Sequence, residues 1–111
     1  MSLFQTIVRL FQSRVEPTLI TADTRIRIER LFPPNEQAQV ITILESQCVL
    51  SKGSPELLDQ VRFSVLKVSD GSLSELLSAV KLASYDWRDI ISKAGLGHPN
   101  FRTWMPEKKW Q

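Results

Sequence analysis

Apolar residues recur at spacings of three and four along most of this chain, a pattern that predicts amphipathic α-helices. The first such segment covers residues 2–14, and Pro17 ends it. Its apolar side is made by Leu3, Phe4, Ile7, Val8, Leu10 and Phe11. Further helices are predicted at residues 23–32, 35–50, 55–68, from 72 onward, at 85–94, and as a single turn within 101–105.

The segment from residue 18 to 28 fits two patterns. Residues 24–28 alternate polar and apolar side chains as a strand does, whereas residues 28–32 place apolar side chains on one helix face. We favour a short helix from about residue 23, with Thr21 or Asp23 near its cap. The prolines at 33 and 34 end it, because the residue before a proline is pushed out of helical geometry.

Several helix starts carry local signals. Residues 54–56, Ser-Pro-Glu, place a hydroxyl cap, a proline in the first turn and an acid at the positive helix end. Ser72 and Glu75 match a capping box, in which the Glu75 side chain is expected to reach back to the Ser72 N–H. Ser84 is predicted to cap the next helix, and Gly95 is predicted to end it in a left-handed conformation.

The helix predicted at 55–68 is apolar around much of its circumference, which is typical of a central helix. The next helix is expected to bury one face, made by Leu73, Leu76, Leu77 and Val80. We therefore predict an all-α fold, a compact bundle or orthogonal array of five to six helices, with short connections and a single domain over residues 1–111. In it, residues 1–15 are a peripheral amphipathic helix and residues 106–111 are a tail.

Composition narrows the class of protein. The net charge of +2 is spread over both halves of the chain, which argues against nucleic-acid binding, since that usually concentrates positive charge on one face. The single cysteine, Cys48, excludes an intrachain disulfide, and with a single histidine, His98, it argues against a zinc site. No apolar run approaches the roughly 20 residues of a membrane span, and no secretory signal is recognisable, so we expect a cytoplasmic protein without cofactors.

Three phrases resemble a family of short bacterial all-helical proteins that have no established activity. They are LFPPNE at 31–36, VRFSVLKVSDG at 61–71, and DWRDII at 86–91 followed by Ala94-Gly95. The family's pattern is similar to LFPPEE, VRFAVLKLSEG and DWRDLLMAAGF, in the same order. Such proteins often have a glycine and a longer connection after the cysteine, whereas here Val49 follows Cys48. The resemblance implies an all-helical fold in a bacterial cytosol, and no activity.

Two charged motifs have both a chemical and a structural interpretation. Asp86 and Asp89 lie three residues apart, a spacing that suits proton transfer or a divalent ion. We favour a structural role, because carboxylates stabilise the positive end of a helix. Arg62 could receive an anion, but we favour a surface pair with Asp59 or Glu56, or simple solvation.

The remaining reactive residue types also favour structural roles. Cys48 lies on the apolar face of its helix, and free cysteines are among the most buried residues, so we expect it in the core. His98 stands between a glycine and a proline in a loop, and we expect it to be exposed and inert. The glycines form no phosphate-binding loop. We therefore predict no catalytic, cofactor-binding or metal-binding residue.

The favoured function is a non-catalytic protein–protein interaction module, whose partner is another protein or a second copy of the chain. The amphipathic segment 1–14 packs on its own core or in a homodimer, docks on another protein, or meets a membrane. Membrane binding is disfavoured because two basic residues are few for lipid attachment. The aromatic and basic tail is expected to dock on the core. The candidate interaction surface consists of Phe4, Phe11, Arg88, Arg102, Trp104 and Trp110.

Two other classes of function each require a specific arrangement. A nucleic-acid-binding accessory protein needs basic side chains that converge on one face, namely Arg88, Lys93, Arg102, Lys108 and Lys109. An enzyme or small-ligand carrier needs a concave pocket in which titratable groups meet, namely Arg62, Asp86, Asp89 and His98.

Overall fold

The computed structural model describes residues 18–111, which form five α-helices and one short 3₁₀ helix and contain no strand. The elements are α2 (Ala22–Leu31), α3 (Pro34–Gln47), α4 (Pro55–Ser69), α5 (Leu73–Tyr85), α6 (Trp87–Ala94) and η1 (Phe101–Thr103). The predicted all-α fold is confirmed for this part of the chain. The helix predicted at 2–14, with Phe4 and Phe11, lies outside the described residues.

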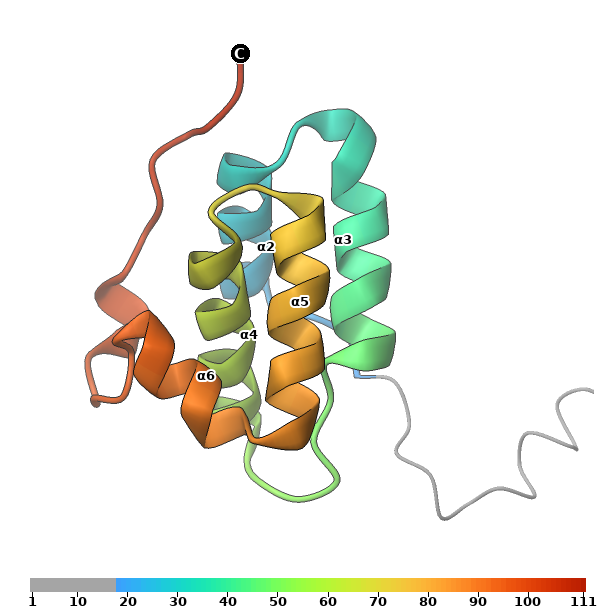
Figure 1. Cartoon of the computed structure of the whole chain (residues 1–111). Coiled ribbons are helices and arrows are strands. Elements are labelled where there is room, and N and C mark those ends of the chain that lie inside the picture. The colour runs from blue at the N-terminus through green and yellow to red at the C-terminus, as the bar shows by residue number, and fades with distance from the viewer. Residues whose placement is uncertain (1–17) are drawn as a thin grey trace, which may run out of the picture.

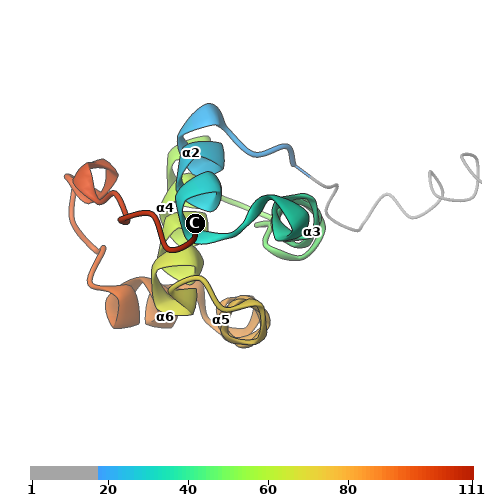
Figure 2. The same cartoon turned by 90° about the horizontal axis from the view of Figure 1, so that it is seen from above.

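Helix α4 is the centre of the fold. Helices α2 to α5 stand side by side, and α6 lies next to α4 at one end of this group (Figure 1). Viewed from above, α4 lies between α2 on one side and α6 on the other (Figure 2). All six residues from 61 to 66 are buried. The central position predicted from the apolar circumference of this helix is confirmed.

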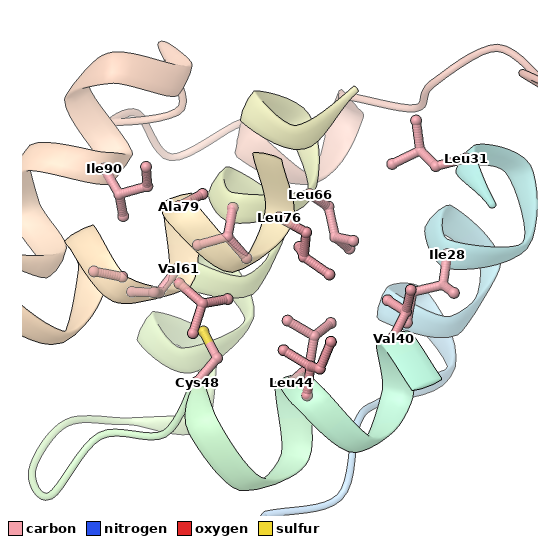
Figure 3. Packing of buried hydrophobic residues seen from close by; sticks show 14 of the residues in the cluster. Ile28, Leu31, Val40, Leu44, Cys48, Val61, Leu66, Leu76, Ala79 and Ile90 are labelled. Carbon is pink, nitrogen blue, oxygen red and sulfur yellow. The ribbon is translucent and has the colours of Figure 1, made fainter. Parts of the chain in front are cut away.

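The core takes side chains from all five α-helices. Figure 3 shows part of this cluster, which includes Ile28, Val40, Val61, Leu76 and Ile90. A smaller cluster adjoins it and consists of Phe63, Ala94, Leu96 and Phe101. The predicted face of α5 is wrong at one position, because Leu77 is 44 % exposed. The buried stripe of α5 runs instead through Leu76, Ala79, Val80 and Ala83, at helical spacing.

The helix caps agree with the sequence signals at some positions and not at others. Thr21, Ser54 and Ser72 each accept a hydrogen bond from a backbone N–H of the helix that follows. The capping box at Ser72 is only half formed, because the Ser72 N–H donates to the Ser69 carbonyl and not to Glu75. The prediction that Ser84 is a cap is wrong. Its hydroxyl donates back to the Lys81 carbonyl within α5.

The sequence left the start of one helix open and led to a wrong prediction for the end of another. The segment around residue 23 is helical, since α2 begins at Ala22 with Thr21 as its cap. Helix α3 ends at Gln47, three residues before the predicted end, because Cys48 leaves helical geometry. The chain then crosses to α4 through residues 48–54.

The C-terminal tail docks along α2, as expected. The Arg30 guanidinium donates to the Pro106 carbonyl, and the Arg30 carbonyl accepts from the Lys109 N–H at 2.8 Å. The Trp110 indole N–H donates to the Glu29 carbonyl, also at 2.8 Å. The bonds from Lys109 and Trp110 satisfy two carbonyls in the last turn of α2, which have no partner within the helix.

Candidate functional site

Asp86 and Asp89 form the start of α6 and not a separate site. Asp86 is the cap of the helix, in extended geometry, and its carboxylate accepts from the Arg88 N–H at 3.0 Å. The Asp89 N–H donates to the Asp86 carbonyl, so the second acid lies in the first turn. Both carboxylates therefore lie at the positive end of the helix, which supports the structural interpretation.

Arg62 is buried, so the expected surface pair or solvation is wrong. The residue is 1 % exposed, and its guanidinium donates to four backbone carbonyls. Two are at the end of α3, from Leu44 and Cys48, each at 3.0 Å. The other two belong to Thr18 and Leu19, at 2.8 and 3.3 Å. Burial lowers the pKa of Arg62, although the carbonyls satisfy its N–H donors.

Cys48 is a core residue, as predicted. It is 4 % exposed, and its side chain points into the main cluster (Figure 3). Burial raises the pKa of its thiol from 9.0 to about 11, against a smaller opposing effect of Arg62. A thiol in this state is not a nucleophile near neutral pH.

We therefore expect Cys48 to react with a thiol reagent at least about 100-fold more slowly in the folded chain than in the unfolded chain at pH 8. The reaction of the thiol is followed by absorbance with and without denaturant, and equal rates would contradict the buried position.

The raised pKa of Cys48 has a second consequence, which is that the free energy of unfolding falls as the pH rises from 9.0 to about 11. Over that range the unfolded thiol loses its proton while the folded thiol keeps it.

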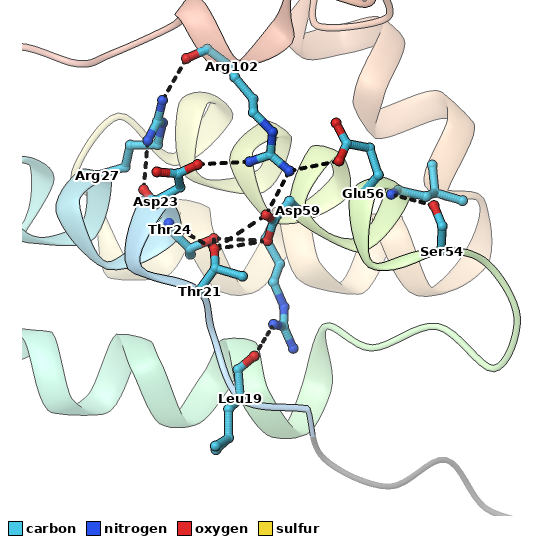
Figure 4. A network of polar contacts seen from close by, with 11 residues as sticks. Leu19, Thr21, Asp23, Thr24, Arg27, Ser54, Glu56, Asp59 and Arg102 are labelled. Carbon is cyan, nitrogen blue, oxygen red and sulfur yellow. Dashed lines mark hydrogen bonds and ion pairs between the residues drawn. The ribbon is translucent and has the colours of Figure 1, made fainter.

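A second polar cluster joins η1 to α2 and α4. Figure 4 shows Arg102 reaching from η1 to three carboxylates, those of Asp23, Glu56 and Asp59, at 3.0 to 3.1 Å. The Asp59 side chain is only 6 % exposed, and it also accepts hydrogen bonds from the hydroxyls of Thr21 and Thr24. Hydrogen bonding to Glu56 raises the pKa of Arg102. This cluster connects segments that lie far apart in the sequence.

Arg27 completes the connection between α2 and the chain around η1. Its guanidinium donates to the carbonyls of Asp23, Arg102 and Trp104 at 2.7 to 3.1 Å. It also lies 4.1 Å from the centre of the Phe63 ring. Burial lowers the pKa of Arg27. The sequence analysis did not single out Arg27, because its position beside residue 104 depends on the tertiary fold.

An open groove of about 580 Å³ lies beside α4 and α6. We call it the α4–α6 groove. It is lined by Glu56, Gln60, Trp87, Arg88, Ile91, Gly97, His98, Pro99 and Phe101. Its apolar side chains come from α6, from η1 and, at Pro99, from the loop between them. Its polar side chains come from α4, α6 and the same loop.

The groove is held in shape by contacts on both sides. The Gln60 side chain donates to the Leu96 carbonyl at 2.8 Å and so ties α4 to the loop after α6. Trp87 is half-buried against the main core, and the Arg88 guanidinium lies 5.2 Å from the centre of its ring. The Glu56 carboxylate at the rim is already paired with Arg102.

The groove unites only some of the residues that the sequence singled out. Arg88 and His98 line it, and His98 is exposed as expected. Asp86, Asp89 and Arg62 do not line it, so the constellation required for an enzyme does not form there. Trp104 does not line the groove and packs, partly buried, against both core clusters.

Four of the five basic residues proposed for nucleic-acid binding have local partners, and the fifth, Lys93, is exposed. Arg102 is paired with acids, and the Lys109 ammonium lies 3.0 Å from the Asp70 carboxylate. The Lys108 ammonium lies 4.0 Å from the centre of the Trp110 ring. Arg88 is the most exposed member of the set that forms an ion pair, at 77 %, and it lies 3.8 Å from Asp86.

Within residues 18–111, no group of three His, Cys, Asp or Glu side chains is placed to hold a metal ion. Every buried side-chain nitrogen or oxygen in this range has a hydrogen-bond partner. Among the described helices, none has the length and apolar character needed to span a membrane.

Comparison with known proteins adds no relative. No family model, no curated protein and no solved structure matches the chain. The likeness to a bacterial helical family in three phrases therefore stays a prediction from the sequence.

Proposed function

We propose that this chain is a non-catalytic protein–protein interaction module whose α4–α6 groove binds an apolar peptide segment of a partner protein. The observation that carries the proposal is the groove itself, an open hollow of about 580 Å³ with Trp87, Ile91 and Phe101 among its lining. Tryptophan and arginine are enriched among the residues that dominate binding energy at interfaces. Both residue types line this groove, and the Arg88 guanidinium lies 5.2 Å from the centre of the Trp87 ring.

The open shape of the α4–α6 groove favours a peptide over a small molecule as its ligand. Small-molecule sites usually enclose 70–90 % or more of the ligand surface, in volumes of roughly 300–1,000 Å³. The α4–α6 groove has such a volume but is open to solvent. A peptide suits this shape, since it can place one or two anchor side chains in the groove while its backbone stays at the rim.

The charges at the rim favour a partner with acidic residues beside its apolar anchor. The Glu56 carboxylate lies 3.1 Å from Arg102, which offsets part of its charge, although Arg102 also pairs with Asp23 and Asp59. Arg88 is highly exposed, and its contact with Asp86 is long at 3.8 Å. The exposed His98 imidazole lies on the same rim. Complementary charge of this kind gives selectivity among partners.

The proposal also includes a cytoplasmic location, and the bacterial setting that the sequence resemblance implies. A second copy of the chain is an allowed partner. It would have to present an apolar segment flanked by acids to the groove.

The test begins with selection of random peptides displayed on phage, using the full chain as bait. We expect enriched peptides to share an aromatic or aliphatic anchor with neighbouring Asp or Glu. Affinity is then measured by fluorescence anisotropy for two variants with the same charge change. Arg88→Glu at the rim should weaken binding by about tenfold or more. Arg25→Glu, at an exposed position on α2, should change it by less than about twofold.

Two results would contradict the proposal. One is selection without any enriched peptide motif. The other is an equal loss of affinity in the Arg88 and Arg25 variants, which would indicate a non-specific electrostatic contact. Circular dichroism of both variants checks that their helices are intact.

A further inference from the structure

An exposed tyrosine lies directly beside the α4–α6 groove. Of the aromatic residues within 18–111, only Tyr85 is exposed, at 77 %, and the others are buried or half-buried. It is the last residue of α5, and it precedes Asp86 and the groove residue Trp87. We propose that the partner of the groove is a second copy of this chain, which inserts its Tyr85 side chain there. The inference rests on the proposed function, because it names the occupant of the same groove.

Tyr85 meets the requirements that the groove sets for its ligand. The large exposed apolar side chains of the described chain are Leu19, Ile26, Leu77, Tyr85 and Met105. Only Tyr85 has an acid next to it in the sequence, namely Asp86, which is also exposed. Residues 85 and 86 therefore present an anchor with an acid beside it.

The chemistry of tyrosine also fits the lining of the groove. Its ring is a large apolar surface, and tyrosine is enriched among the residues that dominate binding energy at interfaces. Its hydroxyl is a hydrogen-bond donor. Glu56 and Gln60 in the lining carry oxygens that accept hydrogen bonds, and Ile91 and Phe101 offer apolar contacts. A groove of about 580 Å³ has room for one such ring.

The position of Tyr85 next to the groove allows a symmetric pair. A two-fold interface uses the same patch on both copies, so the anchor and its site must lie on one continuous patch. Tyr85 and Trp87 are two residues apart, across the turn from α5 to α6 (Figure 1). Two copies related by a two-fold axis can therefore exchange Tyr85 side chains, and the pair closes with two anchors.

Asp86 and Arg88 make this patch complementary to itself. Within one copy their contact is long, at 3.8 Å, and the Arg88 and Asp86 side chains are 77 % and 57 % exposed. Such a contact contributes little to stability. In the symmetric pair, each Arg88 meets the acid beside the incoming tyrosine, so two contacts of opposite charge form between the copies. Matching charges of this kind select one arrangement among many encounters.

Sedimentation velocity of the full chain over a range of concentrations measures self-association. We expect a monomer–dimer equilibrium. Tyr85→Ala should weaken it by about 100-fold or more, since each dimer loses two anchors of about tenfold each. Arg88→Glu should weaken it as strongly, because it repels Asp86 of the other copy. Ile26→Ala, at an exposed position on α2, is the control and should change it by less than about twofold.

A mixture of the two defective variants tests whether Tyr85 enters the groove of the other copy. Tyr85→Ala keeps the groove and lacks the anchor, whereas Arg88→Glu keeps the anchor and has an altered groove. A mixed pair has one intact contact, and a pair of either variant alone has none. We expect the equimolar mixture to associate about tenfold more tightly than either variant alone. A mixture that associates no more tightly than its components would overturn the proposal.

Binding of a selected peptide examines the groove separately from self-association. Tyr85→Ala leaves the groove intact, so we expect it to bind the peptide. A chain that stays monomeric up to about 0.5 mM while it binds the peptide would overturn the symmetric pair and leave the groove as a site for another protein. A chain that binds no peptide, and whose association is unaffected by Arg88→Glu, would overturn both this inference and the proposed function. Circular dichroism checks that every variant is folded.

Discussion

Replacing Arg62 by methionine is expected to lower the free energy of unfolding by about 3 kcal/mol or more. Methionine fills much of the same space but donates no hydrogen bond. The carbonyls of Leu44 and Cys48 would then be left buried without their partner. Each buried unsatisfied group costs about 1–3 kcal/mol, whereas the carbonyls of Thr18 and Leu19 are nearer the surface and can be hydrated.

Arg62 also stabilises the end of α3 electrostatically. The last carbonyls of a helix form its negative end, and a cation there is favourable. Arg62→Lys keeps the charge but loses the planar set of donors that reaches several carbonyls at once. We expect it to recover only part of the loss. Arg25→Met, at an exposed position on α2, is the matched control and should change stability by about 0.5 kcal/mol or less.

Urea unfolding followed by circular dichroism measures these differences. If Arg62→Met lowers the free energy of unfolding by less than about 1 kcal/mol, the buried role of Arg62 is contradicted. A loss that small is what a single hydrogen bond at the surface contributes. If Arg62→Met does not fold at all, Arg62→Lys should still fold, with a free energy of unfolding below that of the control Arg25→Met.

Replacing Arg102 by glutamine is expected to lower the free energy of unfolding by about 2 kcal/mol. The contacts with Asp23 and Glu56 contribute little, because those carboxylates are 53 % and 63 % exposed. The contact with Asp59 matters more, because that side chain is 6 % exposed and would lose its cation. Hydrogen bonds from Thr21 and Thr24 remain and limit the loss.

A double-mutant cycle with Asp59→Asn isolates the pair. We expect a coupling free energy of about 1–2 kcal/mol between Arg102 and Asp59, and less than about 0.5 kcal/mol between Arg102 and Glu56 in a parallel cycle with Glu56→Gln. Coupling of the same size in both cycles would show that burial of Asp59 has no special effect. Thermal unfolding of the six proteins provides the data.

Local sequence patterns were sufficient to predict most of the helices. Spacings of three and four located α3 to α6, and Ser54-Pro55 and Gly95 marked real helix ends. One error arose where two local signals compete. Ser84 and Asp86 are both good caps, and the structure uses Asp86 because α5 continues to Tyr85.

The polar contacts were harder to predict, because they join segments distant in the sequence. Arg62 reaches residues 18 and 44, and Arg102 reaches residues 23 and 59. One signal was present in the sequence. The apolar circumference of α4 implied a buried helix, and Arg62 stands in the middle of it. A charged residue in that position must be buried with partners, and this argument would have corrected the expectation of solvation.

The α4–α6 groove was only partly visible in the sequence. Arg88 and His98 were singled out, but nothing in their spacing placed them beside Glu56 or Phe101. Their proximity follows from the turn between α5 and α6 and from the bond of Gln60 to the Leu96 carbonyl. Such a groove is defined by tertiary packing and not by a motif.

Mapping a selected peptide onto the ¹⁵N NMR spectrum of the full chain tests the central claim most directly. Binding in the α4–α6 groove predicts that the Trp87 indole signal and the backbone amides of Arg88, Gly97 and His98 shift together as peptide is added. The indole signals of Trp104 and Trp110 should change much less. Shifts confined to α2 and the tail, or to residues 18–21 and the loop before α4, would contradict the assignment of the groove as the binding site.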